Sequence, residues 1–350
     1  MEDDSAKPKR RIRYKGTHPR NFKEKYKELN PSQYAGDIQK IISQGKTPAG
    51  MHRPICVNEI LNFLNVVPGQ TGMDATLGYG GHTLELLKLG ARLFSTDVDP
   101  IEFPKTCERI RLQGYDSEVF FPIQKNFSQI DEIVSLSGPL DFVIADLGVS
   151  SMQIDNPDRG FTFKHDGPLD LRLNPDEGMP ASILLQTLSP GDLEDLLINN
   201  SDEEYAEPIA QAIRFARSKG HTPETTKQLK ELIESALAFL PPSIKKEEIK
   251  KACQRTFQAL RIAVNNEFEV LDTFLEKLPA ALKPGGKIAI LTFHSGEDRR
   301  VKKSFQKFFR EGIYSEVSPT PIRASVEECA ANPRAKSAKL RVGVVGNSEF

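Results

Sequence analysis

Hydrophobic positions along the chain fall into two patterns: short apolar runs typical of buried strands, and longer stretches with an apolar residue every three or four positions, typical of helices. From His52 onward the two kinds of segment alternate, which indicates an α/β fold with a mostly parallel sheet. The pattern predicts strands over residues 72–76, 92–97, 140–146, 287–293 and 340–345.

The third and fourth of these strands are separated by about 140 residues, far more than one crossover helix needs. We therefore expect an inserted, mainly helical subdomain in this interval. A helix is predicted to begin at Ser189-Pro190, and a second to begin at Thr222-Pro223 and stop at Pro241-Pro242.

An apolar stripe at the end of the interval predicts a single crossover helix that leads back to the sheet. The stripe consists of Phe257, Leu260, Val264, Phe268, Leu271, Leu275 and Leu278. The predicted organisation is an N-terminal arm (1–50), a sheet domain (51–155 and 250–350) and the helical insertion (156–249).

Composition narrows the class of protein. The 350 residues are 38% hydrophobic and 27% charged, a balance typical of globular chains. Apolar runs are far shorter than the ~20 residues of a membrane span, which excludes an integral membrane protein. The four cysteines form no CxxC pair, so no metal site or disulfide framework is predicted. Without an apolar leader at Met1, we expect a cytoplasmic protein.

Charge is distributed unevenly although the net charge is only −1. Between Lys7 and Lys27 there are ten lysines or arginines against the single acid Glu24, with Tyr14 and Phe22 among them. Basic arms of this kind are typical of segments that contact nucleic-acid phosphates, and the aromatic rings offer stacking surfaces. A solubilising tail is the alternative.

A glycine-rich loop follows the first predicted strand, in Asp74-Ala-Thr-Leu-Gly-Tyr-Gly80-Gly81-His82. Glycines there let a ligand approach the backbone and the following helix N-terminus. Asp97 closes the next strand, where a carboxylate can accept both hydroxyls of a ribose. Together they indicate a nucleoside-containing cofactor. Thr83 occupies the third glycine position of the dinucleotide motif, but the loop alone does not separate a nicotinamide dinucleotide from S-adenosylmethionine, and a tight turn without a ligand is a further alternative.

Two more polar motifs come at strand ends, where ligands bind in open α/β sheets. Asp146-Leu-Gly-Val-Ser-Ser151 follows the third strand, and His294 lies in Thr292-Phe-His-Ser-Gly-Glu-Asp-Arg299 after the fourth. The alternatives are a helix cap by Asp146 or Ser150 and a solvated turn at Glu297. Three such motifs on one sheet nevertheless predict a single site.

In these segments the chain resembles the bacterial small-subunit ribosomal RNA N4-cytosine methyltransferases, the MraW/RsmH family. The resemblance covers roughly residues 52–341, and the string from Asp166 to Arg172 is the most specific part. Other matching segments are His52-Arg-Pro-Ile, Gly80-Gly-His, Asp97-Val-Asp-Pro, Asn126-Phe-Ser, Asp146 to Asp155, Arg159 to Phe163, Arg255 to Ile262, Thr292-Phe-His-Ser and Asn332 to Arg341. Two features depart from the family: Gly296 replaces a usual leucine, and the basic arm is longer.

The resemblance implies a Rossmann-like class I S-adenosylmethionine-dependent methyltransferase sheet with an inserted substrate-recognition subdomain. It implies N4-methylation of a cytidine in 16S ribosomal RNA near the decoding centre, within the assembled 30S subunit, and leaves a homodimer open. S-adenosylmethionine would contact Gly80, Gly81 and His82, with Asp97 on its ribose and Phe127 beside its adenine. Asp146 and Gln153 would close the pocket.

Methylation of the cytosine amine requires an acceptor for an N–H hydrogen bond, because the nitrogen lone pair is delocalised into the ring. It also requires an unstacked base and a methyl group held in line. Asp146 is the first candidate for the acceptor. Ser150 and Ser151 would frame the base, and His294 is a weaker candidate for positioning the substrate.

Five arginines in the matched segments have no evident core role and are predicted either to contact RNA or to form ordinary salt bridges. They are Arg159, Arg172, Arg255, Arg261 and Arg334. Two other functions remain open from the residues alone: a dinucleotide-dependent oxidoreductase, favoured by the glycine loop, and a non-catalytic RNA-binding protein, favoured by the arm.

Overall fold

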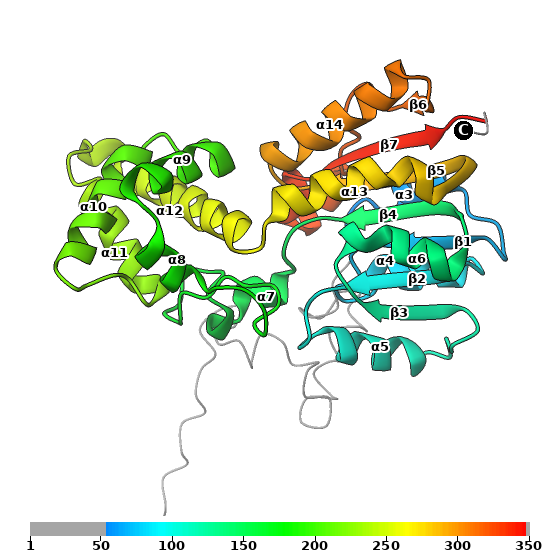
Figure 1. The fold of residues 1–350 in the computed structure, drawn as a ribbon, viewed down its shortest axis with the longest axis horizontal. Helices are drawn as coiled ribbons and strands as arrows, with labels where there is room; N and C mark the ends of the chain where they lie inside the picture. The colour runs from blue at the N-terminus through cyan, green and yellow to red at the C-terminus, as the bar shows by residue number, and fades with distance from the viewer. Residues whose placement is uncertain (1–53, 348–350) are drawn as a thin grey trace, which may run out of the picture. The chain divides into compact units, whose positions relative to one another are not determined.

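One seven-stranded sheet organises the part of the chain that the structure, a computed structural model, describes: residues 54–347, without the side chain of Ser151. The strand order is β3-β2-β1-β4-β5-β7-β6 (Figure 1). Neighbours from β3 to β5 run parallel, and β7 runs antiparallel to β5 and β6. The strands are β1 Thr71–Asp74, β2 Arg92–Asp97, β3 Phe120–Gln124, β4 Leu140–Asp146, β5 Leu282–Thr292, β6 Tyr314–Val317 and β7 Lys339–Val345.

All five strands expected from the sequence are present, and β2 and β4 have the predicted bounds. β3 and β6, the two edge strands of the sheet, were not expected from the sequence. Pro122 interrupts β3, and proline is tolerated only where a strand can spare an N–H donor, as at an edge. Since β6 has four residues, two of them exposed, its apolar pattern is too short to recognise.

Helices cover both faces of the sheet. Apolar side chains of α3 Val57–Leu64, α4 Gly81–Lys88 and α5 Phe103–Arg111 form one core cluster with the strands. On the other face a second cluster includes α6 Ile130–Ser137, α13 Glu267–Ala281 and α14 Ser295–Arg310. The short α15 Val326–Ala331 precedes β7. Burial on both faces fixes the strand ends that carry the polar motifs.

The helical insertion has a core of its own, formed by buried residues between Phe161 and Leu260. Figure 1 shows it as a separate group of helices beside the sheet. Its helices are α8 Ala181–Thr187, α9 Pro190–Ser201, α10 Ala206–Ser218, α11 Thr226–Ala236 and α12 Pro242–Val264. The domain boundaries stay predictions, and position 249 lies inside α12.

The single crossover helix expected from the apolar stripe is wrong, because α12 and α13 are separate helices. Asn266 adopts a left-handed backbone with φ of 50°, which asparagine tolerates better than most residues. Consequently Phe257 packs into the helical core while Leu271 and Leu278 pack against the sheet. The stripe is continuous in sequence but serves two cores.

The two predicted helix starts had different outcomes. The start of α9 is confirmed, since the Ser189 hydroxyl accepts a hydrogen bond from the Asp192 backbone N–H. The start at Thr222 is wrong: Thr225 forms an extended bridge with Pro168 and then caps α11. The predicted stop at Pro241-Pro242 is also displaced, because α11 ends at Ala236 and Pro242 occupies the first turn of α12. None of the helices among residues 54–347 is long and apolar enough to cross a membrane.

Candidate active site

The glycine loop joins β1 to α4, where the sequence placed it. Gly80 has φ of 72°, and a Cβ there would lie 2.7 Å from Cδ1 of Ile110 on α5. Only glycine fits because both the left-handed backbone and the close approach exclude a side chain. The backbone N–H of Gly78 donates to Oδ2 of Asp97 at 2.7 Å, which ties the loop to the end of β2. Gly81 begins α4, so the first free N–H groups of that helix lie in the same loop.

Thr83 explains why the dinucleotide pattern fails at its third glycine. Its hydroxyl donates to Oδ2 of Asp74 at 2.7 Å, and the Thr76 N–H donates to Oδ1 of the same carboxylate at 3.0 Å. Asp74 is 1% exposed, and this burial raises the pKa of its carboxyl group, although the Thr83 hydroxyl opposes the shift. A glycine at position 83 would leave a buried carboxyl oxygen without this donor.

We expect the substitution Thr83→Val to lower the free energy of unfolding by about 1–3 kcal/mol, because it removes a hydrogen bond to a buried carboxyl group at nearly constant volume. Urea denaturation measures the change. The control Thr83→Ser keeps the hydroxyl and should lose clearly less stability. Equal losses in the two variants would show that the methyl group, rather than the hydrogen bond, stabilises the loop.

Asp97 lies at the end of β2 beside the glycine loop, as expected for a ribose ligand. One oxygen accepts from Gly78 and the other from the Asp99 N–H at 2.9 Å. Burial raises the pKa of Asp97 to about 6, although both N–H donors oppose the shift. Each carboxylate oxygen can accept two hydrogen bonds, so both retain capacity for hydroxyl donors.

The sequence analysis assigned no role to Asp99, although it lies in a matched segment. Its carboxylate accepts from Nε2 of Gln153 at 2.7 Å and from NH1 of Arg159 at 2.9 Å, in an almost fully buried ion pair. Asp99 thereby holds the start of the insertion against β2. Gln153 also accepts the Ser150 N–H, so its amide already has protein partners on both sides. Its predicted place in the cofactor pocket stays a prediction.

Asp146 ends β4, next to β1 in the sheet, where the strand order reverses and open α/β sheets bind ligands. Its backbone N–H donates to the Thr76 hydroxyl at 2.7 Å, and its carboxylate is 28% exposed. Nε2 of His82 lies 3.5 Å from Oδ2 of Asp146. This nitrogen is buried and makes no hydrogen bond within the described residues. The structure therefore brings His82 and Asp146 together beside the glycine loop.

Ser150 and Ser151 begin α7 Ser151–Asp155. The Ser150 hydroxyl accepts the Gln153 N–H at 3.2 Å in a capping box, so the helix-cap alternative is correct for this residue. The Ser151 side chain lies outside the described part of the structure. Whether either hydroxyl also contacts a base stays a prediction.

His294 precedes α14 and belongs to a buried charged network. Its Nδ1 accepts the Glu297 N–H at 3.4 Å, and its Nε2 lies 3.1 Å from Oε1 of Glu297. Although burial opposes it, His294 and Arg261 hold the pKa of Glu297 below its usual value. The alternative of a solvated turn at Glu297 and Asp298 is wrong, since Glu297 is 4% exposed and Asp298 pairs with Lys339 and Arg341. A Cβ at Gly148 would lie 3.8 Å from Cδ2 of Phe293, so the loops after β4 and β5 are neighbours.

Glu267, His294 and Glu297 offer three donor atoms within 4.8 Å of one another, a spacing that a metal could use. Arg261 donates two hydrogen bonds to Glu267, at 2.7 and 2.9 Å. Glu297 accepts the Phe293 N–H at 2.9 Å. With both carboxylates already partnered, the cluster is better described as an ion-pair network that fixes the His294 loop.

Phe127 opens the short 3-10 helix Phe127–Gln129 after β3. Its ring packs edge-on against Phe274 of α13 with centroids 5.0 Å apart. Since β3 runs parallel to β2, the ring and Asp97 both lie at the carboxyl ends of the strands. A contact with adenine stays a prediction.

Four of the five arginines that could have contacted RNA are in ion pairs within the protein, as the salt-bridge alternative anticipated. Their carboxylate partners differ: Arg159 pairs with Asp99, Arg172 with Asp170, Arg255 with Glu203 and Arg261 with Glu267. These pairs join the sheet to the insertion or stabilise the insertion itself. Arg334 also interacts with other groups of the chain.

S-adenosylmethionine fits the residues at this edge. Asp97 has spare acceptor capacity for a ribose, and the His82 nitrogen is buried without a hydrogen-bond partner among residues 54–347. The carboxylates of Asp97 and Asp146 also favour a positively charged ligand. When bound, this group supplies an electrophilic methyl on a sulfonium.

Fold and site together define a class I S-adenosylmethionine-dependent methyltransferase. The MraW methylase family matches residues 49–344, and the chain belongs to this family. It is 60% identical to ribosomal RNA small subunit methyltransferase H 2 of Alkaliphilus metalliredigens, over 97% of this chain and 99% of that protein. It is 58% identical to ribosomal RNA small subunit methyltransferase H 1 of Lachnoclostridium phytofermentans, over 97% and 94%.

A more distant relative aligns with a smaller share of the chain. Ribosomal RNA small subunit methyltransferase H of Cyanothece sp. is 40% identical over 84% of this chain and 95% of its own. The two nearer relatives align with most of the N-terminal arm, because their alignments leave only 3% of this chain uncovered. The arm itself lies outside the described residues.

Proposed function

We propose that this protein transfers a methyl group from S-adenosylmethionine to N4 of a cytidine in small-subunit ribosomal RNA, near the decoding centre. The partly exposed carboxylate of Asp146, beside the glycine loop and the His294 loop, is the observation that carries the proposal. The relatives named as small-subunit RNA methyltransferases support the substrate. Membership of a methylase family disfavours both the oxidoreductase and the non-catalytic alternative.

In this proposal the residues of the chain hold both reactants and accept one hydrogen bond. Asp97 holds the ribose of S-adenosylmethionine, and the Gly80 turn contacts the same cofactor. Asp146 accepts the N–H hydrogen bond of the cytosine amine, which favours a pyramidal nitrogen with its lone pair directed at the methyl group. Nε2 of His82 lies 3.5 Å from the Asp146 carboxylate, on the side of the glycine loop.

The direct test is incubation of the full-length protein with labelled S-adenosylmethionine and small-subunit RNA, followed by mass spectrometry of the nucleosides. N4-methylcytidine is the expected product. A different methylated nucleoside would refute the proposed acceptor, and absence of methylation on every form of the RNA would refute the activity.

The form of the substrate and the oligomeric state are finer parts of the proposal. The same assay on free RNA and on assembled 30S subunits distinguishes the two substrates, and we expect the subunit to react faster. Sedimentation of the protein tests the homodimer. The basic arm is proposed to strengthen RNA binding, so removal of residues 1–45 should flatten the salt dependence of binding and leave the product unchanged.

A further inference from the structure

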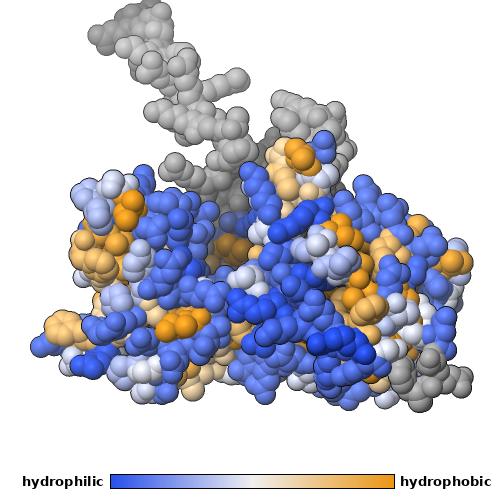
Figure 2. Space-filling model, turned by 90° about the horizontal axis from the view of Figure 1, so that it is seen from above, coloured by the Kyte–Doolittle hydropathy of each residue, from blue (hydrophilic) through white to orange (hydrophobic). Residues whose placement is uncertain are grey.

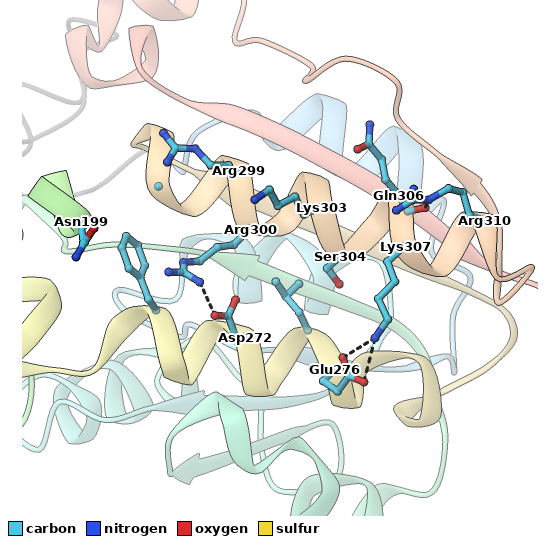
Figure 3. Close-up of a pocket in the computed structure, with 13 residues that line it drawn as sticks. Asn199, Asp272, Glu276, Arg299, Arg300, Lys303, Ser304, Gln306, Lys307 and Arg310 are labelled. Carbon is cyan, nitrogen blue, oxygen red and sulfur yellow. Dashed lines mark hydrogen bonds and ion pairs between the residues drawn. The ribbon is translucent and has the colours of Figure 1, made fainter. Parts of the chain in front are cut away.

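A basic groove lies between α13 and α14, on the side of the sheet away from α4 and α5. Its volume is about 740 Å³, and Asn199 of α9 borders one end of it. Figure 3 shows the cationic side chains of α14 along one side and Asp272 and Glu276 of α13 along the other. Figure 2 looks onto the top of Figure 1, where α14 lies, and shows a mostly hydrophilic surface.

The charge of the groove is strongly positive. Five of its side chains are cations, Arg299, Arg300, Lys303, Lys307 and Arg310, against two carboxylates, which leaves an excess of three positive charges. Lys303 and Arg310 have no carboxylate partner among residues 54–347. The other three cations make partly exposed ion pairs, which contribute little stability and can exchange for another anion.

The spacing of the cations follows one face of the helix. Arg299, Lys303, Lys307 and Arg310 are separated by four, four and three residues, so they form one stripe along α14. Successive members are roughly 4.5–6 Å apart along the helix axis, from the rise per residue. A linear row of cations suits a linear row of phosphates better than a single anion.

One end of the groove lies at the start of α14, next to the His294 loop. Gly296 lines it two positions after His294. A Cβ at position 296 would lie 2.6 Å from Cζ of Phe268, so the glycine admits this ring. The Arg300 guanidinium in turn lies 4.1 Å from the ring centroid. The ring and the guanidinium plane are surfaces on which nucleotide bases stack.

We propose that the α13–α14 groove binds the sugar-phosphate backbone of the ribosomal RNA that flanks the methylated nucleotide. This inference rests on the proposed function, which provides the RNA. It assigns RNA contact to residues that the sequence analysis did not consider, in place of the arginines that the structure shows in internal ion pairs. An acidic protein is the competing occupant, and the experiment distinguishes it.

The test compares two neighbouring charge reversals in the full-length protein, Lys303→Glu in the groove and Lys302→Glu outside it. Lys302 is also exposed on α14 but does not line the groove, so the change in net charge is matched. Binding of small-subunit RNA is measured over a series of salt concentrations. We expect Lys303→Glu to bind roughly tenfold more weakly, with a salt slope shallower by about 0.7–0.9 for each lost phosphate contact.

Methylation assays separate this role from catalysis. Lys303→Glu should raise KM for RNA and leave kcat unchanged, because the lost contact binds the RNA equally well before and during methyl transfer. Equal RNA affinities and slopes for the two variants would overturn the inference. Unchanged binding of free RNA with weaker binding of whole subunits would assign the groove to a ribosomal protein and also overturn it. If the wild-type protein binds RNA without methylating it, the proposed function fails, and the same comparison still decides the groove.

Discussion

The variant Asp146→Asn should slow methyl transfer by roughly 10²–10⁴-fold if the carboxylate accepts the hydrogen bond or the proton of the cytosine amine. Asparagine keeps the shape of the side chain but replaces one acceptor oxygen with a donor NH₂ group. The backbone N–H of residue 146 still reaches the Thr76 hydroxyl, so the end of β4 should keep its conformation. Single-turnover methylation of small-subunit RNA is the measurement.

Cofactor affinity must be separated from chemistry in this experiment, because Asp146 lies beside the glycine loop. The reaction is therefore run at saturating S-adenosylmethionine. Asp141→Asn is the matched control: Asp141 is at the opposite end of β4, where it pairs with Lys283. The variant Asp141→Asn should lower the free energy of unfolding but leave the rate of methyl transfer unchanged. Near-normal turnover by Asp146→Asn would move the acceptor role elsewhere, with His294 the next candidate.

Most of the sheet could be predicted from the sequence because its central strands are buried on both faces. β4 is a nearly continuous apolar run, β2 is buried from Leu93 to Thr96, and each strand ends in an aspartate at the edge of the core. The edge strands β3 and β6 lack this pattern, since one contains Pro122 and the other is half exposed. Pattern recognition therefore succeeded where burial constrains both faces of a strand.

The break between α12 and α13 shows a different limit. Apolar periodicity reports which positions are buried but not which core buries them, so one stripe can continue across a turn. The Asn265-Asn266 pair was the available signal, because asparagine favours the left-handed conformation that Asn266 adopts.

Within the site, residue type and strand position predicted Asp97 and Asp146 at one edge of the sheet, whereas the partners of these residues depend on the fold. The Thr83–Asp74 hydrogen bond joins residues nine apart, and the Asp99–Arg159 pair joins residues 60 apart. The groove on α14 is harder still to predict. A helical stripe of cations is common on solvated helices. This stripe differs because it lines a groove in which Phe268 packs against Gly296, and that contact depends on the fold.

Asp97→Asn should weaken S-adenosylmethionine binding by roughly one to two orders of magnitude, because hydrogen bonds to a charged acceptor are worth about 1.5–3 kcal/mol each. Titration calorimetry measures the affinity. Asp131→Asn, which changes an exposed carboxylate on α6, is the control and should bind normally. Unchanged affinity in Asp97→Asn would refute the ribose contact.

The pH dependence gives a second, independent readout of the same contact. Ribose hydroxyls donate to the ionised carboxylate, and burial raises the pKa of Asp97 to about 6. Affinity should therefore fall by roughly tenfold as pH decreases from about 7 to 5, whereas Asp97→Asn should show no such step. The contribution of Asp97 to the folding stability of the free protein depends on pH in the opposite direction. Folding favours the protonated group, so its stabilising contribution is complete in acid and is lost as pH rises through about 6. A wild-type affinity that stays constant over this range would show that the bound ribose does not use the Asp97 carboxylate, even if the substitution weakens binding by disturbing the Gly78 turn.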